Sequence, residues 1–544
     1  MKVVIIGGVA AGMSAATRLR RLRESASITV YEMGEHVSYA NCGLPYFLSD
    51  VISERDDLLL QTPTSLFNRF RIDVKVRSMV TAINRENKTV TVKNFETGET
   101  FDDSYDKLII STGAKPRQLG IKGIERALAL RNVVDADVAK AAVERAGGKP
   151  VVILGAGFIG IELAENLRHL GVPTTVVQRG ASILSIFDPE MVEPLQQRLV
   201  ANGVELVLNS EPVEITESAV VLADGRELEA AVVFTAAGVD PDNSLAKAAG
   251  LRIGETGGLW VDDQQRTSDP DIFAAGDAVE KHGQLTGAET LIPLANLANR
   301  HGRLIADAIA GLDVKTHDAI GTVIIGAFGL ATAIAGLSER AAKRAGIAHQ
   351  IIHLHPSSHA GYYPGAKRVS IKVLFDPATG RILGAQANGE DGVDKRIDVL
   401  ATAIYAGLTV DDLMDLELAY APQFGSAKDA INQAGYVGNN TWSGNTPNVQ
   451  WHDLVAAQAQ GAVVIDVRTA SENAAGSIPG AVNIPVDELR EHASELVGQD
   501  VVVHCAVGQR GHTAVQLLKG FGVQARNLDG GYITWRAGMD ALAR

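Results

Sequence analysis

The chain has 544 residues, which allows roughly three to four domains of about 150 residues each. Its 46% hydrophobic and 21% charged residues exclude a disordered chain, and a formal net charge of −14 argues against nucleic-acid binding because an acidic surface repels phosphate. The two cysteines, Cys42 and Cys505, exclude a disulfide-stapled secreted fold and a zinc ribbon, so we expect reduced thiols and a cytoplasmic protein.

The N-terminal segment predicts a nucleotide-binding βαβ unit. An apolar strand over 3–6 leads into the glycine turn 7–12, a helix to about Arg23 and a second strand over 28–31 that ends in Glu32. Such a turn lets a pyrophosphate approach the helix N-terminus, and Glu32 lies where a ribose hydroxyl would be held. The turn departs from the G-x-G-x-x-G pattern, because Val9 occupies the middle glycine position.

The same order of elements recurs over 151–177. A strand over 151–154 precedes the loop Gly155-Ala-Gly157-Phe-Ile-Gly160, a helix from Ile161 and a strand over 174–177. That strand ends in Gln178-Arg179 without an acidic residue, which leaves NADH and NADPH both open. Segments 105–113 and 269–277 return to the first unit, so the second domain is inserted into the first. Two dinucleotide sites in one chain imply an electron relay between a tightly held flavin and an exchangeable nicotinamide.

The rest of the chain loses the βαβ order. Residues 319–338 carry no charge over 20 positions, but glycines interrupt the run, so we predict two buried strands and a turn rather than a membrane span. A strand over 369–375 and a helix over about 392–406 indicate an α+β domain, and 437–449 reads as a flexible polar linker. No metal site is predicted: His353, His355 and His359 cluster without acidic or thiol ligands and are expected at the surface or in a channel.

Cys42 lies in the motif Ser38-Tyr-Ala-Asn-Cys-Gly-Leu-Pro-Tyr46. This motif resembles the single-cysteine pyridine nucleotide-disulfide oxidoreductases, which include coenzyme A-disulfide reductases, NADH-dependent persulfide reductases, and NADH oxidases and peroxidases. The resemblance covers about 1–436, and the absence of a C-x4-C pair excludes the two-cysteine members. It implies an FAD-binding domain (1–115 and 245–316), an NAD(P)H-binding domain (116–244) and a dimerisation domain (317–436) in a homodimer.

The resemblance also implies the residues of each site. Those expected to bind FAD are Gly7, Gly8, Ala11, Gly12, Glu32, Met33, Val80, Ser111, Thr112, Gly113, Gly276, Asp277, Pro293 and Ala295. Those expected to bind NAD(P)H are Gly155, Gly157, Phe158, Ile159, Gly160, Glu162, Gln178 and Arg179. Those expected to bind coenzyme A are Ser14, Arg18, Arg21, Ser38, Asn41, Arg71, Asn299 and Lys428. Tyr362 and Tyr420 are expected to reach Cys42 from the partner subunit.

A single thiolate can attack a sulfur–sulfur bond and keep one fragment as a mixed disulfide or persulfide. The same thiolate can instead react with peroxide and pass through sulfenic acid, and Cys42 alone does not choose between these outcomes. Arg18 and Arg21 lie three residues apart, on one face of the first helix, and a pair of guanidiniums suits phosphate. Arg69 and Arg71 could add to the same patch.

Cys505 opens the loop Cys505-Ala-Val-Gly508-Gln-Arg510, directly after the apolar strand 501–504. A strand, a short loop and a helix aim several backbone N–H groups at one sulfur and can hold a persulfide anion. Arg510 follows Cys505 after four residues, whereas the phosphatase pattern C-x5-R needs five. Together with 463–468, 476–485 and 528–535, the loop makes 450–544 resemble an active rhodanese domain.

The sequence therefore predicts an α/β fold: two nested Rossmann-like domains, an α+β dimerisation domain and a C-terminal α/β rhodanese domain. The predicted function is FAD-dependent NAD(P)H reduction of coenzyme A persulfide, polysulfide or coenzyme A disulfide at Cys42, with sulfur transfer at Cys505. Two alternatives remain: an NADH oxidase or peroxidase using a Cys42 sulfenic acid, and a sulfurtransferase whose flavin half is a redox sensor. The direction of sulfur flow stays open, and no nucleic-acid or membrane partner is expected.

Overall fold

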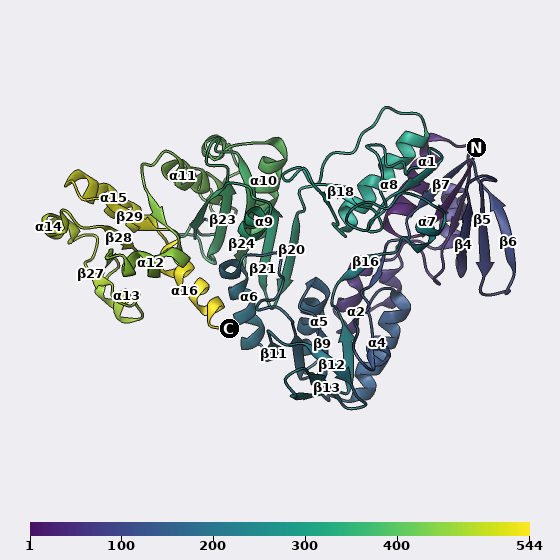
Figure 1. Ribbon diagram of the computed structural model, residues 1–544, viewed down its shortest axis with the longest axis horizontal. Coiled ribbons are helices and arrows are strands. Elements are labelled where there is room, and N and C mark those ends of the chain that lie inside the picture. Colours follow the sequence, from purple (N-terminus) through teal and green to yellow (C-terminus); the bar gives the residue numbers. More distant parts are fainter. The chain divides into compact units, whose positions relative to one another are not determined.

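The computed structural model describes residues 1–544, in two compact units (Figure 1). The first unit comprises Met1–Arg179 and Val204–Ala319, and the second comprises Gly180–Gly203 and Ile320–Arg544. None of the helices has both the length and the apolar character that crossing a membrane requires.

The first unit is built on a five-stranded parallel sheet in the order β17-β7-β1-β2-β3. The strands are β1 (Lys2–Ile6), β2 (Ser27–Tyr31), β3 (Asp73–Lys75), β7 (Lys107–Ile110) and β17 (Ile272–Ala274). Helices α1 (Ala10–Leu22) and α8 (Ala295–Ile309) pack against each other beside this sheet (Figure 1). Since β2 and β7 flank β1 on opposite sides, the N-terminus of α1 lies at the switch point of the sheet, where parallel sheets bind ligands.

A second parallel sheet of the first unit has the order β11-β10-β9-β15. Its strands are β9 (Val151–Leu154), β10 (Thr174–Val177), β11 (Val204–Val207) and β15 (Val232–Thr235), with helices α4 (Val133–Ala146) and α5 (Phe158–His169). Helix α5 begins three residues before the predicted Ile161, directly after Gly157. The two nested nucleotide-binding domains predicted from the sequence are thus present.

Smaller elements complete the first unit. The antiparallel sheets are β4 (Ser78–Asn84), β5 (Thr89–Asn94) and β6 (Thr100–Ser104), and β12 (Pro212–Ile215), β13 (Ala219–Leu222) and β14 (Glu227–Glu229). The paired short strands are β8 (Ala114–Pro116) with β16 (Val239–Pro241), and β18 (Lys281–His282) with β19 (Glu289–Thr290). The short helices are α2 (Leu44–Leu48), α3 (Pro63–Phe70) and α7 (Ser244–Ala248).

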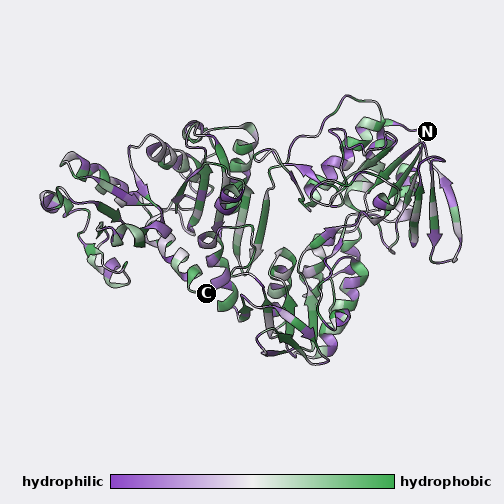
Figure 2. Cartoon of the chain, in the orientation of Figure 1, coloured by the Kyte–Doolittle hydropathy of each residue, from purple (hydrophilic) through white to green (hydrophobic).

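The second unit contains an antiparallel sheet in the order β20-β21-β24-β23-β22. Its elements are β20 (Val323–Ala327), β21 (Leu330–Gly336), α9 (Glu339–Arg344), β22 (Gln350–Leu354), β23 (Val369–Phe375), β24 (Ile382–Gly389), α10 (Val393–Ala406) and α11 (Ala430–Trp442). The uncharged run 319–338 forms the hairpin β20–β21, whose turn at Phe328-Gly329 has positive φ angles of 50° and 75°. Hydrophobic residues follow the strands of this sheet (Figure 2).

The C-terminal part of the second unit is a five-stranded parallel sheet in the order β25-β29-β28-β26-β27. Its strands are β25 (Asn448–Val449), β26 (Val463–Asp466), β27 (Val482–Asn483), β28 (Val501–His504) and β29 (Ala525–Leu528). Its helices are α12 (Leu454–Ala459), α13 (Ala470–Ala474), α14 (Leu489–His492), α15 (Gln509–Gly520) and α16 (Gly531–Leu542).

The predicted flexible linker 437–449 is wrong for most of its length. Residues up to Trp442 continue helix α11, whose N-terminus is capped by the Asp429 side chain. Gly438 packs so tightly on Val410 that an added Cβ would lie 2.8 Å from the valine Cβ. Asn448 and Val449 then pair with β29 as strand β25. The polar composition that suggests a linker here belongs to a helix whose small residues face the neighbouring segment.

Helix α6 (Pro189–Ala201) also departs from the prediction. The sequence assigns it to the NAD(P)H-binding domain, but it packs in the second unit, against α16 and strands β21 and β24. Asp188, at its N-cap, explains this placement. Its carboxylate accepts hydrogen bonds from the backbone of Glu339 at 2.9 Å and from the Gln386 amide at 2.6 Å.

Candidate functional site

The first glycine loop packs so closely against neighbouring backbone that two of its positions have no room for a side chain. Gly7 has φ of 99°, and a Cβ on it would overlap the Ser111 carbonyl oxygen, while a Cβ on Gly12 would overlap the Gly7 carbonyl. Val9, at the N-cap of α1, makes no capping hydrogen bond with its side chain, so the first N–H groups of the helix are available to an anion.

Glu32 is fixed by backbone donors at the end of β2. Its two carboxylate oxygens accept hydrogen bonds from the N–H groups of Gly8 at 2.8 Å and Gly34 at 2.7 Å. The carboxylate therefore has a defined orientation beside the loop, as a ribose-binding acid requires.

A cavity of about 220 Å³ opens between this loop and Glu32. Among its lining residues, those predicted to bind FAD are Gly7, Ala11, Glu32, Met33, Val80, Ser111, Thr112, Gly113, Gly276 and Asp277. Gly8 and Gly12 belong to the loop behind it, Ala295 lines a different cavity, and Pro293 lines neither. Residues that sequence reasoning missed are Tyr39, Arg131, Asp242 and Ser244, which no local motif marks. A free helix N-terminus, an oriented carboxylate and this cavity fit an FAD dinucleotide.

The second glycine loop repeats this geometry. Gly155 has φ of 110°, and added Cβ atoms on Gly155 and Gly160 would overlap backbone carbonyls. Gly157 caps α5 without a side chain, which leaves that N-terminus free, and Phe158, Ile159 and Glu162 lie on the helix behind it. Gln178 accepts a hydrogen bond from Ala156 N–H at 3.4 Å, and Arg179 is exposed at the end of β10. The loop fits a second dinucleotide, and the choice between NADH and NADPH, which the sequence leaves open, is to be measured.

Cys42 lines a second cavity of about 420 Å³, which shares Val9 and Ala10 at the start of α1 with the first. The 3₁₀ turn Asn41–Gly43 carries the cysteine into the wall of this cavity, just before α2. The predicted substrate residues that line it are Ser14, Arg21, Ser38, Asn41 and Asn299. Arg69 also lines it, and Ser14 donates a hydrogen bond to Asn299 at 2.5 Å.

Three predicted substrate residues lie elsewhere. Arg18 pairs with Asp307 at 2.7 Å, so Arg18 and Arg21 do not form a free pair of guanidiniums. Arg71 ends α3 in the left-handed region with φ of 49°, and its guanidinium lies 5.1 Å from the centre of the Phe67 ring. Lys428 belongs to the second unit. Of the four arginines proposed for phosphate, Arg21 and Arg69 remain in the cavity.

The surroundings of Cys42 oppose thiolate formation. Neighbouring protein atoms partly desolvate the sulfur, and this burial raises the pKa of Cys42, with further increases from the Glu162 and Asp277 carboxylates. Burial raises the pKa of Glu162 itself to about 7, against a smaller opposite effect of the Tyr46 hydroxyl, which lies 3.5 Å from it. Glu162 therefore changes charge near neutral pH, close to the thiol.

We predict that Glu162→Gln lowers the pKa of Cys42, because it removes a carboxylate that is negative above about pH 7. The measurement is the pH dependence of iodoacetamide alkylation in a Cys505→Ser background, which should shift to lower pH. Glu144→Gln, at an exposed position of α4, is the control and should leave the profile in place. If Glu162→Gln does not shift the alkylation profile, the Glu162 carboxylate does not influence the pKa of Cys42.

Tyr362 and Tyr420 meet on the surface of the second unit. Their hydroxyl oxygens lie 3.0 Å apart, and the two side chains are 77% and 49% exposed. This contact raises the pKa of Tyr362. Two tyrosines that the sequence separates by 58 positions thus present one paired phenol group to solvent.

Cys505 directly follows strand β28, and its side chain is fully buried. Gly508, with φ of 93°, caps α15 and donates its N–H to Cys505 Sγ at 3.1 Å. The guanidinium of Arg510 faces the cysteine and is held by Glu472 through two bonds of 2.6 and 2.7 Å. Of the predicted cradle of backbone donors, the Gly508 N–H reaches the sulfur, and Glu472 is a component that sequence reasoning missed.

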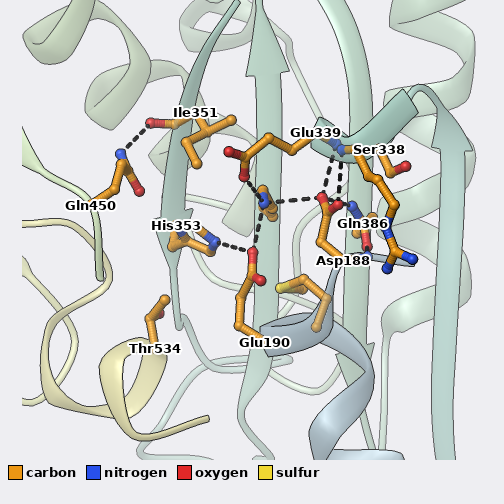
Figure 3. Close-up of polar contacts among 12 residues, drawn as sticks. Asp188, Glu190, Ser338, Glu339, Ile351, His353, Gln386, Gln450 and Thr534 are labelled. Atoms are coloured by element: carbon orange, nitrogen blue, oxygen red, sulfur yellow. Dashed lines mark hydrogen bonds and ion pairs between the residues drawn. The ribbon is translucent and has the colours of Figure 1, made fainter. Parts of the chain in front are cut away.

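A buried ionic cluster lies where α6 meets the antiparallel sheet of the second unit (Figure 3). Lys372 Nζ lies 2.6 Å from Glu190, 2.8 Å from Glu339 and 3.0 Å from Asp188, and its side chain is fully buried. Burial alone would lower the pKa of Lys372, but the three carboxylates raise it instead. These carboxylates lie as close together as metal ligands, and the lysine ammonium supplies their cation.

His353 extends this cluster to the C-terminal domain. It bonds Asp529 at 2.6 Å through Nδ1 and Glu190 at 3.1 Å through Nε2. His355 contacts Thr534 at 2.8 Å in the same way. The expectation of surface or channel histidines is therefore wrong for His353, because acidic partners distant in sequence stabilise its charged ring. It is also wrong for His359, which is buried.

The chain has two dinucleotide-binding loops, a cysteine in the wall of an open cavity, and a second cysteine whose sulfur accepts a backbone N–H. These features define a two-nucleotide oxidoreductase joined to a sulfur-transfer domain. Comparison with known families agrees: pyridine nucleotide-disulphide oxidoreductase matches 1–302, its dimerisation domain matches 324–431, and the rhodanese-like domain matches 450–538. The chain belongs to the pyridine nucleotide-disulphide oxidoreductase family, and its cofactors are FAD and a pyridine nucleotide.

Three relatives are informative. The coenzyme A disulfide reductase of Staphylococcus haemolyticus is 34% identical over 436 residues, 80% of this chain and 98% of its own length. The structure of reduced CoADR-RHD from Bacillus anthracis is 43% identical, with a TM-score of 0.97, and the match covers 99% of this chain and 98% of that one. A NAD-dependent persulfide reductase from A. fulgidus is 36% identical, with a TM-score of 0.92 and coverage of 98% and 100%.

Proposed function

We propose that the protein reduces coenzyme A persulfide or coenzyme A disulfide, and polysulfide, with electrons from NAD(P)H, and that Cys42 is the nucleophile. One observation carries the proposal: the cavity that contains Cys42 also contains Arg21 and Arg69. A thiol and two guanidiniums in one cavity suit a molecule with sulfur in one part and phosphate in another. The likeness to coenzyme A disulfide and persulfide reductases supports the same substrate class.

The thiolate of Cys42 attacks the outer sulfur of a persulfide R–S–SH, and R–S⁻ leaves with the electron pair of the broken bond. The net reaction is R–S–SH + NAD(P)H + H⁺ → R–SH + H₂S + NAD(P)⁺. FAD, when bound, supplies two-electron transfer between the nicotinamide and the sulfur site. Glu32 and the first glycine loop would hold FAD, and the loop Gly155–Gly160 would hold NAD(P)H. Ser38, Asn41 and Asn299 orient the substrate in the Cys42 cavity.

The dimerisation domain gives the exposed tyrosines a role. In a homodimer, Tyr362 and Tyr420 of one subunit would serve Cys42 of the other, where a phenol protonates the leaving thiolate. Their exposure in the single chain and their mutual hydrogen bond support this assignment. Two phenols that pair at the surface do not contribute to packing of the core. Lys428 would act from the same surface.

The Cys505 domain favours sulfur chemistry over oxygen chemistry. A cysteine that accepts an N–H donor at 3.1 Å on its sulfur is suited to carry sulfane sulfur, which neither an NADH oxidase nor a peroxidase needs. We assign Cys505 the role of a sulfur carrier, with the guanidinium of Arg510 beside it.

The test is steady-state NAD(P)H oxidation with coenzyme A persulfide, polysulfide, oxygen and peroxide in the parent and in Arg21→Ala/Arg69→Ala. We expect turnover with the sulfur acceptors, and a KM for coenzyme A persulfide raised at least tenfold in the variant, since each charged hydrogen bond contributes about 1.5–3 kcal/mol. Polysulfide has no phosphate to lose, so its kinetics should stay unchanged. Arg23→Ala, at the C-cap of α1 and bonded to the Ala310 carbonyl, is the matched control.

Equal losses for coenzyme A persulfide and polysulfide would remove the phosphate role from these arginines. Faster turnover with oxygen or peroxide than with any sulfur acceptor would contradict the proposed function itself.

A further inference from the structure

The charged side chains next to Cys505 form a pair of opposite sign, so their net charge is close to zero. Arg510 is the one cation among the side chains of the loop 505–510, since Ala506, Val507 and Gln509 are uncharged. Glu472 accepts two hydrogen bonds from Arg510, at 2.7 and 2.6 Å, and cancels its charge. This ion pair is also why the pKa of Glu472 falls to about 2, so the carboxylate is ionised throughout the range in which an enzyme works.

Other charged groups near the loop do not restore a positive field. Arg468 is buried against Asp466, with its closest contact at 2.6 Å. Burial lowers the pKa of His504 to about 4, with a smaller opposite effect of Asp466, and burial also lowers the pKa of His512, so both rings are neutral at pH 7. The backbone donor of Gly508 already points at Cys505 Sγ.

Glu472 is held in place independently of Arg510. It completes the capping box of α13, in which its carboxylate accepts hydrogen bonds of 3.1 Å from both the backbone N–H and the hydroxyl of Thr469. An incoming anion therefore cannot displace the carboxylate without breaking a helix cap as well. Both Glu472 and Arg510 remain about one-third exposed, so the pair lies within reach of a substrate.

These charges discriminate between sulfur donors. Thiosulfate carries two negative charges and needs cations at its sulfonate group, yet here it would meet a guanidinium that is already paired, with a fixed carboxylate beside it. An organic hydropersulfide carries at most one negative charge on its sulfur, against two on thiosulfate, and its protonated form R–S–SH, which transfers the outer sulfur, carries none there. Its carbon chain can contact the half-buried Ala506 and Val507.

We propose that Glu472 determines the sulfur-donor specificity of the C-terminal domain: it neutralises Arg510, so that Cys505 accepts sulfur from organic hydropersulfides and discriminates against thiosulfate. The accepted reaction is Cys505–S⁻ + R–S–SH → Cys505–S–SH + R–S⁻, in which one S–S bond forms, one breaks and the thiolate leaves with the electron pair. The disfavoured reaction is Cys505–S⁻ + S–SO₃²⁻ → Cys505–S–S⁻ + SO₃²⁻. The inference rests on the proposed role of Cys505 as the sulfur carrier.

The test uses the full-length protein with Cys42→Ser, so that sulfur transfer to cyanide reports on Cys505 alone. Glu472→Gln keeps the shape of the side chain and its contact with the helix cap but removes the charge. We expect kcat/KM for thiosulfate to rise about tenfold, mainly through KM, as an anion gains an unpaired guanidinium. We expect kcat/KM for cysteine persulfide to stay within about twofold.

Glu472→Asp keeps the charge and should leave thiosulfate the poor donor. Glu472→Gln with Arg510→Ala should lose the gain in thiosulfate transfer, because the freed guanidinium is absent. Unchanged thiosulfate kinetics in Glu472→Gln, or equal losses with both donors, would overturn the proposal. Cys505→Ser tests the underlying assignment separately: transfer that survives it would contradict the carrier role of Cys505, whatever Glu472 does.

Discussion

Cys42→Ser is expected to abolish NAD(P)H-dependent reduction of coenzyme A persulfide and polysulfide, with a fall in kcat of roughly a thousandfold or more, as for the loss of other catalytic nucleophiles. Cleavage of a sulfur–sulfur bond needs a thiolate, and a serine hydroxyl is not ionised at neutral pH. The residues that surround the dinucleotide cavity do not include Cys42, so reduction of bound FAD by NAD(P)H should persist. Stopped-flow absorbance of FAD and steady-state sulfide release measure the two steps in one sample.

Cys505→Ser is the matched control for Cys42→Ser, because it removes the other thiol of the chain and leaves the Cys42 cavity intact. It should retain polysulfide reduction. A Cys42→Ser variant that still reduces polysulfide at the parent rate would show that another group is the nucleophile. A comparable loss from Cys505→Ser would show that sulfur must pass through both thiols in sequence.

Lys372→Met is expected to destabilise the second unit by about 3–5 kcal/mol, the usual cost of leaving buried charges without their partner. The lysine contacts Asp188, Glu190 and Glu339 and is fully buried, so its removal leaves three carboxylates to repel one another in a low-dielectric interior. The measurement is the thermal unfolding of the full-length protein, in which the transition of this unit should move down by roughly 10 °C.

Lys343→Met provides a matched control, since Lys343 pairs with the same Glu339 at 2.5 Å but is 59% exposed. An exposed pair of this kind contributes about 0.3–0.5 kcal/mol, so this variant should unfold close to the parent temperature. Equal effects of the two substitutions would mean that the buried cluster adds nothing beyond an ordinary surface ion pair.

The fold could be predicted because its signals are local. Each βαβ unit carries its own apolar strand, its own glycine loop and its own helix, and glycines such as Gly7 and Gly12 are needed where a Cβ would overlap a backbone carbonyl. The uncharged hairpin over 319–338 could be distinguished from a membrane span for the same reason, because glycines fall at its turn.

The failures share a different cause. From the sequence, Arg18 is predicted to bind phosphate, but in the fold it pairs with Asp307, which is 289 positions away. His353 is predicted to lie at the surface or in a channel, but it is buried between Glu190 and Asp529. Nothing in the sequence marks Glu472 as the partner of Arg510. Charge partners that are distant in sequence leave no trace in composition or spacing, so the sequence predicts the elements of a site more reliably than the charges within it.

Helix α6 has a consequence for how the chain is synthesised. Its Glu193 is buried and pairs with Arg544, the last residue of the sequence, at 2.8 Å. The two residues are 351 positions apart, so a ribosome adding about 5–20 residues per second completes Arg544 roughly 20–70 s after Glu193. Lys372 is added about halfway through that interval, so the acidic face of α6 has neither Lys372 nor Arg544 to neutralise it for roughly the first half. The first unit has all of its own strands once Ala319 emerges, whereas α6 must wait until Arg544 has been added.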